Sequence, residues 1–212
     1  MKRKLHFFLG TLILCMTVGC KVGKTEVKEA SELYAEFIAK ITAGLADGFQ
    51  TVSTEELGIS FVFNYGADTL GYCYMDLDGD GTEELLLGED GEGTWANTIY
   101  DIFTMRDGKL VHVVAGGERN RYYLTDKGMG VLANEASSGA ASSYNAYYNY
   151  RDEGLELIEA VVYDGWRDEE HPWFYSNESI SSENAESIYE EAARDIIASY
   201  EYEEIEFILF QE

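Results

Sequence analysis

Positively charged side chains are scarce in this sequence of 212 residues, which holds 15 lysines and arginines against 40 aspartates and glutamates. The formal net charge is therefore −25 at pH 7. A surface of this sign repels phosphate backbones and anionic lipid head groups, so we expect no nucleic-acid partner. The same surface attracts cations.

Histidine is also rare, with three in the chain, and no histidine is paired with a serine or thiol by a catalytic motif. His112 alternates with Leu110 and Val114 in an expected strand, and His171 lies in an acidic stretch. The motifs G-x-S-x-G and H-E-x-x-H are missing, as is a glycine-rich phosphate loop. Carboxylates are so abundant that a glycosidase-like pair could be placed almost anywhere, which makes such a pair uninformative. We expect no enzyme active site.

The sequence has one long apolar run near its start, Leu5 to Gly19, which follows a cationic head formed by residues 1–4. This run is shorter than the roughly 20 apolar residues that a membrane-spanning helix needs. Its length and polarity are typical of a secretory signal.

The run ends in Thr17-Val18-Gly19-Cys20, which resembles the lipobox of bacterial lipoproteins. Gly19 fits the cleavage position, and the thiol of Cys20 would take the diacylglyceryl group. Thr17 departs from the family, which usually carries leucine there. The resemblance implies a chain anchored by its lipid to the extracytoplasmic face of the cell membrane. The alternatives are an ordinary signal peptide cleaved nearby and an uncleaved anchor.

We therefore expect a signal peptide over residues 1–19, a lipidated cysteine and tether over 20–25, and a single domain over 26–212. Removing residues 1–19 takes away three basic residues and no acidic one, which leaves a net charge of −28. With Cys15 removed and Cys20 lipidated, Cys73 is the one remaining cysteine, so no intramolecular disulfide is expected.

The apolar spacing predicts a helix over residues 26–46, since its apolar residues follow the 3.6-residue period. Strands are expected at 59–65, 70–75, 84–87, 98–105, 109–115, 121–125, 129–133, 144–150 and 155–163. The short stretches at 106–108, 126–128 and 151–154 lie between these strands and predict three hairpins. The signal is strong at Asp107-Gly108, because Asp-Gly between apolar runs favours a tight turn.

The stretch 134–143 is small and polar and reads as an exposed loop. A second helix is expected near 182–200 and a last buried strand at 205–210. These elements predict an α+β fold, with a largely antiparallel β-meander sheet and an N-terminal and a C-terminal helix packed on it.

One segment carries clear ligand chemistry, residues 76–84 with the sequence Asp-Leu-Asp-Gly-Asp-Gly-Thr-Glu-Glu. Ca²⁺ takes six to eight oxygen ligands, and acidic residues at alternate positions aim carboxylates at one centre. We expect side-chain ligands from Asp76, Asp78, Asp80 and Glu84 and a backbone carbonyl ligand from Thr82, with water completing the shell. The alternative is an acidic turn without an ion. A bound calcium ion is expected to be structural, holding the flanking strands together.

The loop differs from an EF-hand, because Leu87 replaces the bidentate glutamate and the flanks read as strands. It resembles the strand–calcium loop–strand unit of FG-GAP and VCBS repeats, whose form is D-x-D-x-D-G-x-x-D, with Glu84 in place of the last aspartate. The unit occurs once, so a multi-repeat propeller is not implied. The lipobox, the single loop and the meander together are similar to uncharacterised secreted lipoproteins of gut Firmicutes, a family with no assigned activity.

The leading functional hypothesis is a non-enzymatic, calcium-binding lipoprotein that binds a glycan or protein outside the cell. The first alternative is a carbohydrate-binding module, and a more distant one is an envelope hydrolase. Five aromatic residues could stack on sugars, or could instead pack within an aromatic-rich sheet: Trp95, Trp166, Trp173, Tyr147 and Tyr148.

Overall fold

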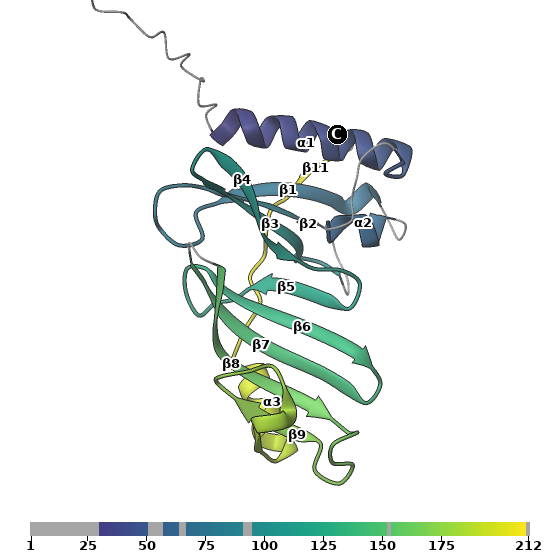
Figure 1. Cartoon of the computed structure of the whole chain (residues 1–212), viewed down its shortest axis with the longest axis vertical. Helices are drawn as coiled ribbons and strands as arrows, with labels where there is room; N and C mark the ends of the chain where they lie inside the picture. Colours follow the sequence, from purple (N-terminus) through teal and green to yellow (C-terminus); the bar gives the residue numbers. More distant parts are fainter. Residues whose placement is uncertain (1–29, 51–56, 64–66, 91–94, 152–153, 211–212) are drawn as a thin grey trace, which may run out of the picture.

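The computed structural model describes residues 30–50, 57–63, 67–90, 95–151 and 154–210. Most of this part of the chain forms one open sheet of eleven antiparallel strands, accompanied by a few helices (Figure 1). The predicted sheet-dominated α+β class is confirmed. The strands are β1 (Leu70–Met75), β2 (Glu84–Glu89), β3 (Thr98–Arg106), β4 (Lys109–Ala115), β5 (Asn120–Leu124), β6 (Val131–Gly139), β7 (Ser142–Arg151), β8 (Gly154–Asp164), β9 (Trp173–Ser176), β10 (Glu186–Ser187) and β11 (Ile208–Leu209).

The sheet branches at β3. The order is β10-β9-β8-β7-β6-β5-β3-β2-β1-β11, and β4 pairs with β3 outside this path. The first half of β3 meets β5 through the pair Ile99 and Tyr122, while its second half pairs with β4. Figure 1 shows the result: β1 to β4 lie at one end of the molecule with helix α1, and β5 to β9 extend toward the other end.

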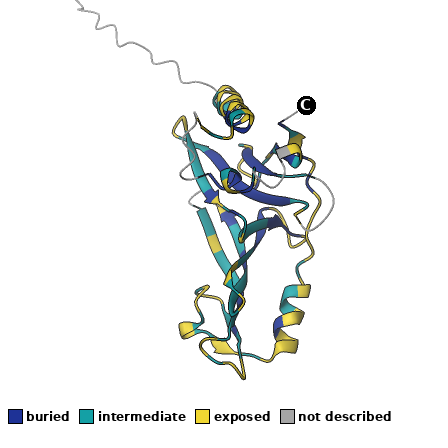
Figure 2. Ribbon diagram, turned by 90° about the vertical axis from the view of Figure 1, so that its right-hand side faces the viewer, coloured by how far each residue is buried: buried dark blue, intermediate teal, exposed yellow. Residues whose placement is uncertain are grey.

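The triple leucine of β2 is buried on both faces of the sheet. Figure 2 shows that buried positions gather in the strands of the sheet, whereas the helices carry exposed positions. Leu85 and Leu87 belong to the same core cluster as Tyr34 and Ile41 of helix α1 (Ala30–Asp47). Leu86 belongs to a second cluster, which includes residues of the C-terminal segment around position 206. Because both faces are covered, β2 shows a continuous apolar run instead of alternation.

The three predicted hairpins are present. The turn between β3 and β4 contains Asp107 with φ of 51° and Gly108 with φ of 70°. Two positive φ values are what a type I′ hairpin turn requires. The hairpins β5–β6 and β7–β8 follow in the predicted places.

The strand predicted at 59–65 is wrong, since Ile59–Val62 forms the short helix α2. The cause is a carboxylate far along the chain. Asp101 accepts hydrogen bonds of 2.8 Å from the backbone N–H groups of Gly58 and Ile59, at the start of this helix. Residues 64–66, the end of the predicted strand, lie outside the described residues.

The predicted loop over 134–143 is also wrong, because this stretch continues β6 and begins β7. Backbone pairing runs through Glu135 with Asn145 and Ser137 with Ser143. Strand pairing uses backbone groups, so small polar side chains continue a strand wherever its face is open to solvent.

The C-terminal elements are shorter than predicted. The helix expected at 182–200 is reduced to α3 (Glu190–Ala198), because a 3₁₀ turn at 182–184 and the pairing of β10 with β9 precede it. No sequence pattern indicated β9. In the expected last strand, only Ile208–Leu209 pairs with β1, although the neighbouring apolar residues are buried. The first four residues of the predicted N-terminal helix, 26–29, lie outside the described residues, and α1 begins at Ala30.

Candidate metal centre

The acidic loop joins two paired strands. Met75 and Glu84 face each other as the last registered pair between β1 and β2, so residues 76–83 close this hairpin. Both ends of the loop are therefore fixed by the sheet, as the strand–loop–strand reading predicted.

Loop carboxylates organise the backbone of the loop around themselves. Asp76 accepts hydrogen bonds from the N–H groups of Gly79 at 2.7 Å and Gly81 at 3.0 Å. Both glycines have positive φ, 77° and 89°, a conformation that side chains with a Cβ disfavour. The N–H of Asp80 in turn donates to Asp78 at 3.2 Å. The repeated Asp-Gly spacing thus allows the chain to wrap around the carboxylate of Asp76.

Three of the predicted ligands converge. One carboxylate oxygen each from Asp76, Asp78 and Glu84 lie within 4.8 Å of one another, close enough to share one cation. Asp80 is not in this group: it is exposed, and its Oδ1 accepts a 2.6 Å hydrogen bond from the N–H of Thr82. The coordination by the Thr82 carbonyl stays a prediction.

Glu84 differs from the other acids because it is buried, with 1% of its surface exposed. Its Oε2 accepts from the N–H of Leu77 at 2.9 Å, and its Oε1 accepts from the hydroxyl of Thr104 at 2.9 Å. Burial raises the pKa of this carboxyl, an effect that these two hydrogen bonds oppose and that the charges of Asp78 and Asp80 reinforce. A divalent cation at the cluster would compensate the charge of a buried carboxylate and the repulsion from its neighbours.

Two tyrosines from distant elements border the loop. Tyr34 of α1 donates a hydrogen bond of 2.9 Å to the backbone carbonyl of Glu83. Tyr150 of β7 is buried, with 1% of its surface exposed. Burial first, and then the charges of Glu84 and Asp78, raise the pKa of Tyr150, an effect that a hydrogen bond with Thr104 and the charge of Arg106 oppose.

The turn between β5 and β6 packs directly on the loop. A Cβ added at Gly130, whose φ is 63°, would collide with the backbone carbonyl of Leu77. The sulfur of Met129 lies 3.2 Å from the position that a Cβ on Gly79 would take. Sequence reasoning missed Tyr34, Tyr150 and Gly130, because nothing in their local sequence marks contact with a loop far away along the chain.

Other predicted residues do not join this centre. Residues 1–19, Cys20 and the rest of the tether at 20–25 lie outside the described residues. The five aromatic residues do not form one platform, since Tyr147 is fully buried while Trp166 is 84% exposed. Tyr147 and Tyr148 are neighbours on β7 and so point to opposite faces of the sheet.

No family model, curated protein or solved structure matches this chain. Among the described residues, no helix is long and apolar enough to cross a membrane.

Proposed function

We propose that this chain is a calcium-binding lipoprotein without enzymatic activity, anchored through Cys20 at the extracytoplasmic face of the cell membrane. The observation that carries the calcium site is the convergence of Asp76, Asp78 and Glu84 at the closed end of the β1–β2 hairpin. The lipid anchor is supported by the signal-like run and the lipobox-like sequence that ends at Cys20.

Calcium suits this site better than magnesium. The carboxylates come from a loop with two positive-φ glycines and from one buried strand position, and Ca²⁺ accepts such irregular oxygen arrangements. Mg²⁺ demands near-octahedral geometry and gives up its water reluctantly. The ion would tie the end of β1 to the start of β2 and, through Leu77 and Tyr34, to the core and helix α1.

The test is calcium-dependent thermal stability. Extracellular calcium modules commonly bind with Kd near roughly 10⁻⁴ M, so about 1 mM calcium should stabilise the folded chain by about 1.4 kcal/mol. For a domain of this size, this corresponds to a rise in Tm of roughly 3–6 °C relative to chelator. Asp78→Asn should abolish the rise, while Asp195→Asn, an equal change of charge on exposed α3, should keep it. Identical wild-type melting curves in chelator and calcium, with no heat of calcium binding, would refute the calcium site.

A further inference from the structure

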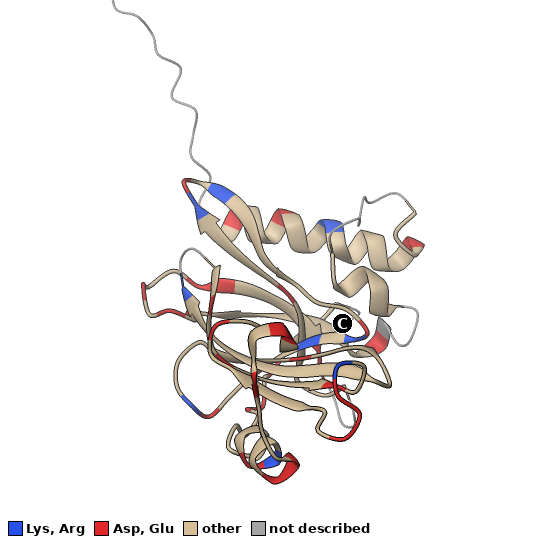
Figure 3. Ribbon diagram, turned by 60° about the horizontal axis from the view of Figure 1, so that its bottom comes forward, with Lys and Arg blue, Asp and Glu red and all other residues tan. Residues whose placement is uncertain are grey.

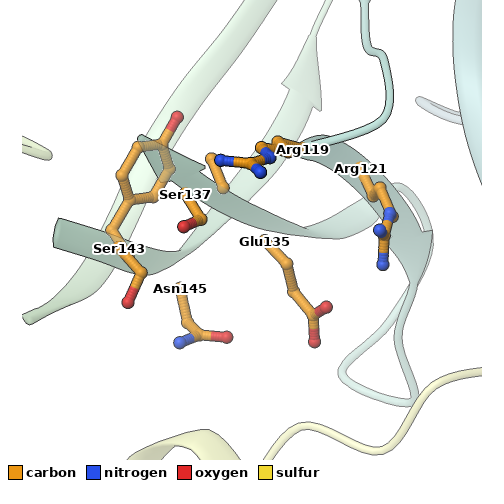
Figure 4. Close-up of a pocket in the computed structure, with 8 residues that line it drawn as sticks. Arg119, Arg121, Glu135, Ser137, Ser143 and Asn145 are labelled. Atoms are coloured by element: carbon orange, nitrogen blue, oxygen red, sulfur yellow. The ribbon is translucent and has the colours of Figure 1, made fainter. Parts of the chain in front are cut away.

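A second feature of this chain is a pocket whose lining residues include none of the proposed calcium ligands. The pocket has a volume of about 360 Å³, within the roughly 300–1,000 Å³ range of small-ligand sites. We call it the arginine pocket and define it by six side chains on β5, β6, β7 and the turn before β5 (Figure 4): Arg119, Arg121, Glu135, Ser137, Ser143 and Asn145.

The two arginines of this pocket are notable because basic side chains are rare in this chain. Figure 3 shows acidic positions on most loops and basic positions at few places. Arg119 and Arg121 nevertheless lie two residues apart on one pocket wall, and within the described ranges neither forms an ion pair. By contrast, Arg151 and Arg194 lie within salt-bridge distance of Glu156 and Glu190.

Arg121 is held in place. Its Nε and Nη2 donate to the carbonyl of Glu118 at 3.0 and 2.7 Å, and its guanidinium carbon lies 3.5 Å from the ring centroid of Trp95. A stacked guanidinium with one edge occupied keeps its remaining N–H groups in a fixed direction, which suits a planar carboxylate. Arg119 is exposed and lies beside Ser137 in Figure 4.

The sheet register supplies the rest of the pocket. Arg121 is paired with Glu135 and Glu135 with Asn145, while Ser137 is paired with Ser143 in the next row on that face. Glu135 and Asn145 point to the same side of the sheet in Figure 4. The hydroxyl and amide groups can both donate and accept hydrogen bonds, and the carboxylate of Glu135 can accept them, as a ligand with several hydroxyl groups requires.

The negative charge of Glu135 favours a singly charged anion over a doubly charged one in the arginine pocket. Among the described residues, Glu135 is the one acid that lines the pocket, and its Oε1 already accepts a 2.6 Å hydrogen bond from the hydroxyl of Tyr202. A carboxylate at this position opposes a doubly charged phosphate more strongly than a singly charged ligand. It can also accept a hydrogen bond from a sugar hydroxyl.

We infer that the arginine pocket binds an acidic sugar of the uronate class, with the sugar carboxylate on Arg119 and Arg121 and the sugar hydroxyls on Glu135, Ser137, Ser143 and Asn145. This site is independent of calcium, and it differs from the tryptophan platform that the sequence suggested, since Trp95 acts here as the surface on which Arg121 stacks.

The test is calorimetric titration of the detergent-purified full-length protein in EDTA, which removes any contribution from calcium. The probes are D-glucuronate and D-galacturonate, with D-glucose and D-galactose as neutral partners of the same shape. At least one uronate should bind tenfold or more tightly than its neutral partner. Arg119→Ala and Arg121→Lys should each weaken that binding at least tenfold, because each removes a charge-assisted hydrogen-bonding fork. Arg194→Ala, which removes the same charge elsewhere, should leave it unchanged.

Several results would overturn the inference. The inference fails if neither uronate binds. It also fails if a uronate and its neutral partner bind with equal affinity. Acetate or inorganic phosphate that binds as tightly as the uronates would show an unspecific anion site. Equal affinities of Arg194→Ala and the two pocket variants would place the ligand elsewhere. Because Arg121→Lys keeps the charge and the aliphatic stem and Arg119 is exposed, both variants should fold, and an unchanged Tm verifies this.

Discussion

The hydroxyl of Tyr34 donates a 2.9 Å hydrogen bond to the backbone carbonyl of Glu83, 49 residues later in the sequence. This bond attaches helix α1 to the acidic loop. The position of the helix and the conformation of the proposed calcium site are therefore coupled.

Replacing Tyr34 by phenylalanine should lower the free energy of unfolding by about 1 kcal/mol, because the Glu83 carbonyl loses its partner while the ring still packs. Tyr147→Phe is the matched control. Its buried hydroxyl has no hydrogen-bond partner within the described ranges, so its removal should be neutral or stabilising. Urea unfolding measures both, and equal losses in the two variants would contradict the assignment.

Asp80→Asn should keep most of the calcium-dependent rise in Tm that Asp78→Asn removes. The Oδ1 of Asp80 accepts from the N–H of Thr82, and Asp80 is not part of the group formed by Asp76, Asp78 and Glu84. Melting curves of both variants with calcium and with chelator check this. If Asp80→Asn also loses the response, the ion is held by the larger ligand set that the sequence predicted.

Gly130→Ala should both destabilise the fold and weaken the calcium response, because the new methyl group would push against the Leu77 carbonyl inside the loop. Left-handed strain and overpacking together should cost about 2–4 kcal/mol. Gly128→Ala is the control, since it also has positive φ but nothing lies within 4 Å of its added Cβ. It should lose some stability yet keep the calcium-dependent shift, and a loss of that shift in Gly128→Ala would contradict the packing argument.

Cys20→Ala should prevent anchoring, because Cys20 carries the one thiol at a lipobox-like position. The variant should be released from cells or remain unprocessed. Metabolic labelling with a palmitate analogue measures the outcome, and a label on the Ala variant equal to that on the wild type would refute lipidation at Cys20.

The first half of the sheet could be predicted from sequence because its signals are local. Aromatic and apolar residues mark β1, and alternation marks β4. Asp107-Gly108 marks the turn between β3 and β4, and the aspartate spacing marks the loop between β1 and β2. Three of the four predicted side-chain ligands converge for the same reason, since a hairpin fixes the ends of its own loop.

The remaining features depend on partners distant in sequence. Residues 59–62 have strand-like composition, yet the carboxylate of Asp101, 42 residues after Ile59, stabilises a helix start there. The pairing of β10 with β9 removes two residues from a stretch with helical spacing. The arginine pocket exists only because Arg121, Glu135 and Asn145 become neighbours across three strands, and the middle of this surface was expected to be a loop.

The two ends of the sheet path are β10 and β11, and each has only two residues. A long free edge offers a row of unpaired N–H and C=O groups on which another chain can add a strand, and this is how β proteins begin to aggregate. Edges this short offer almost no such template, and Glu186 places a carboxylate on one of them. The two ends of the path are thus poor templates for a neighbouring molecule, and the longer edge of this branched sheet is β4, whose seven residues pair with β3 alone among the described strands.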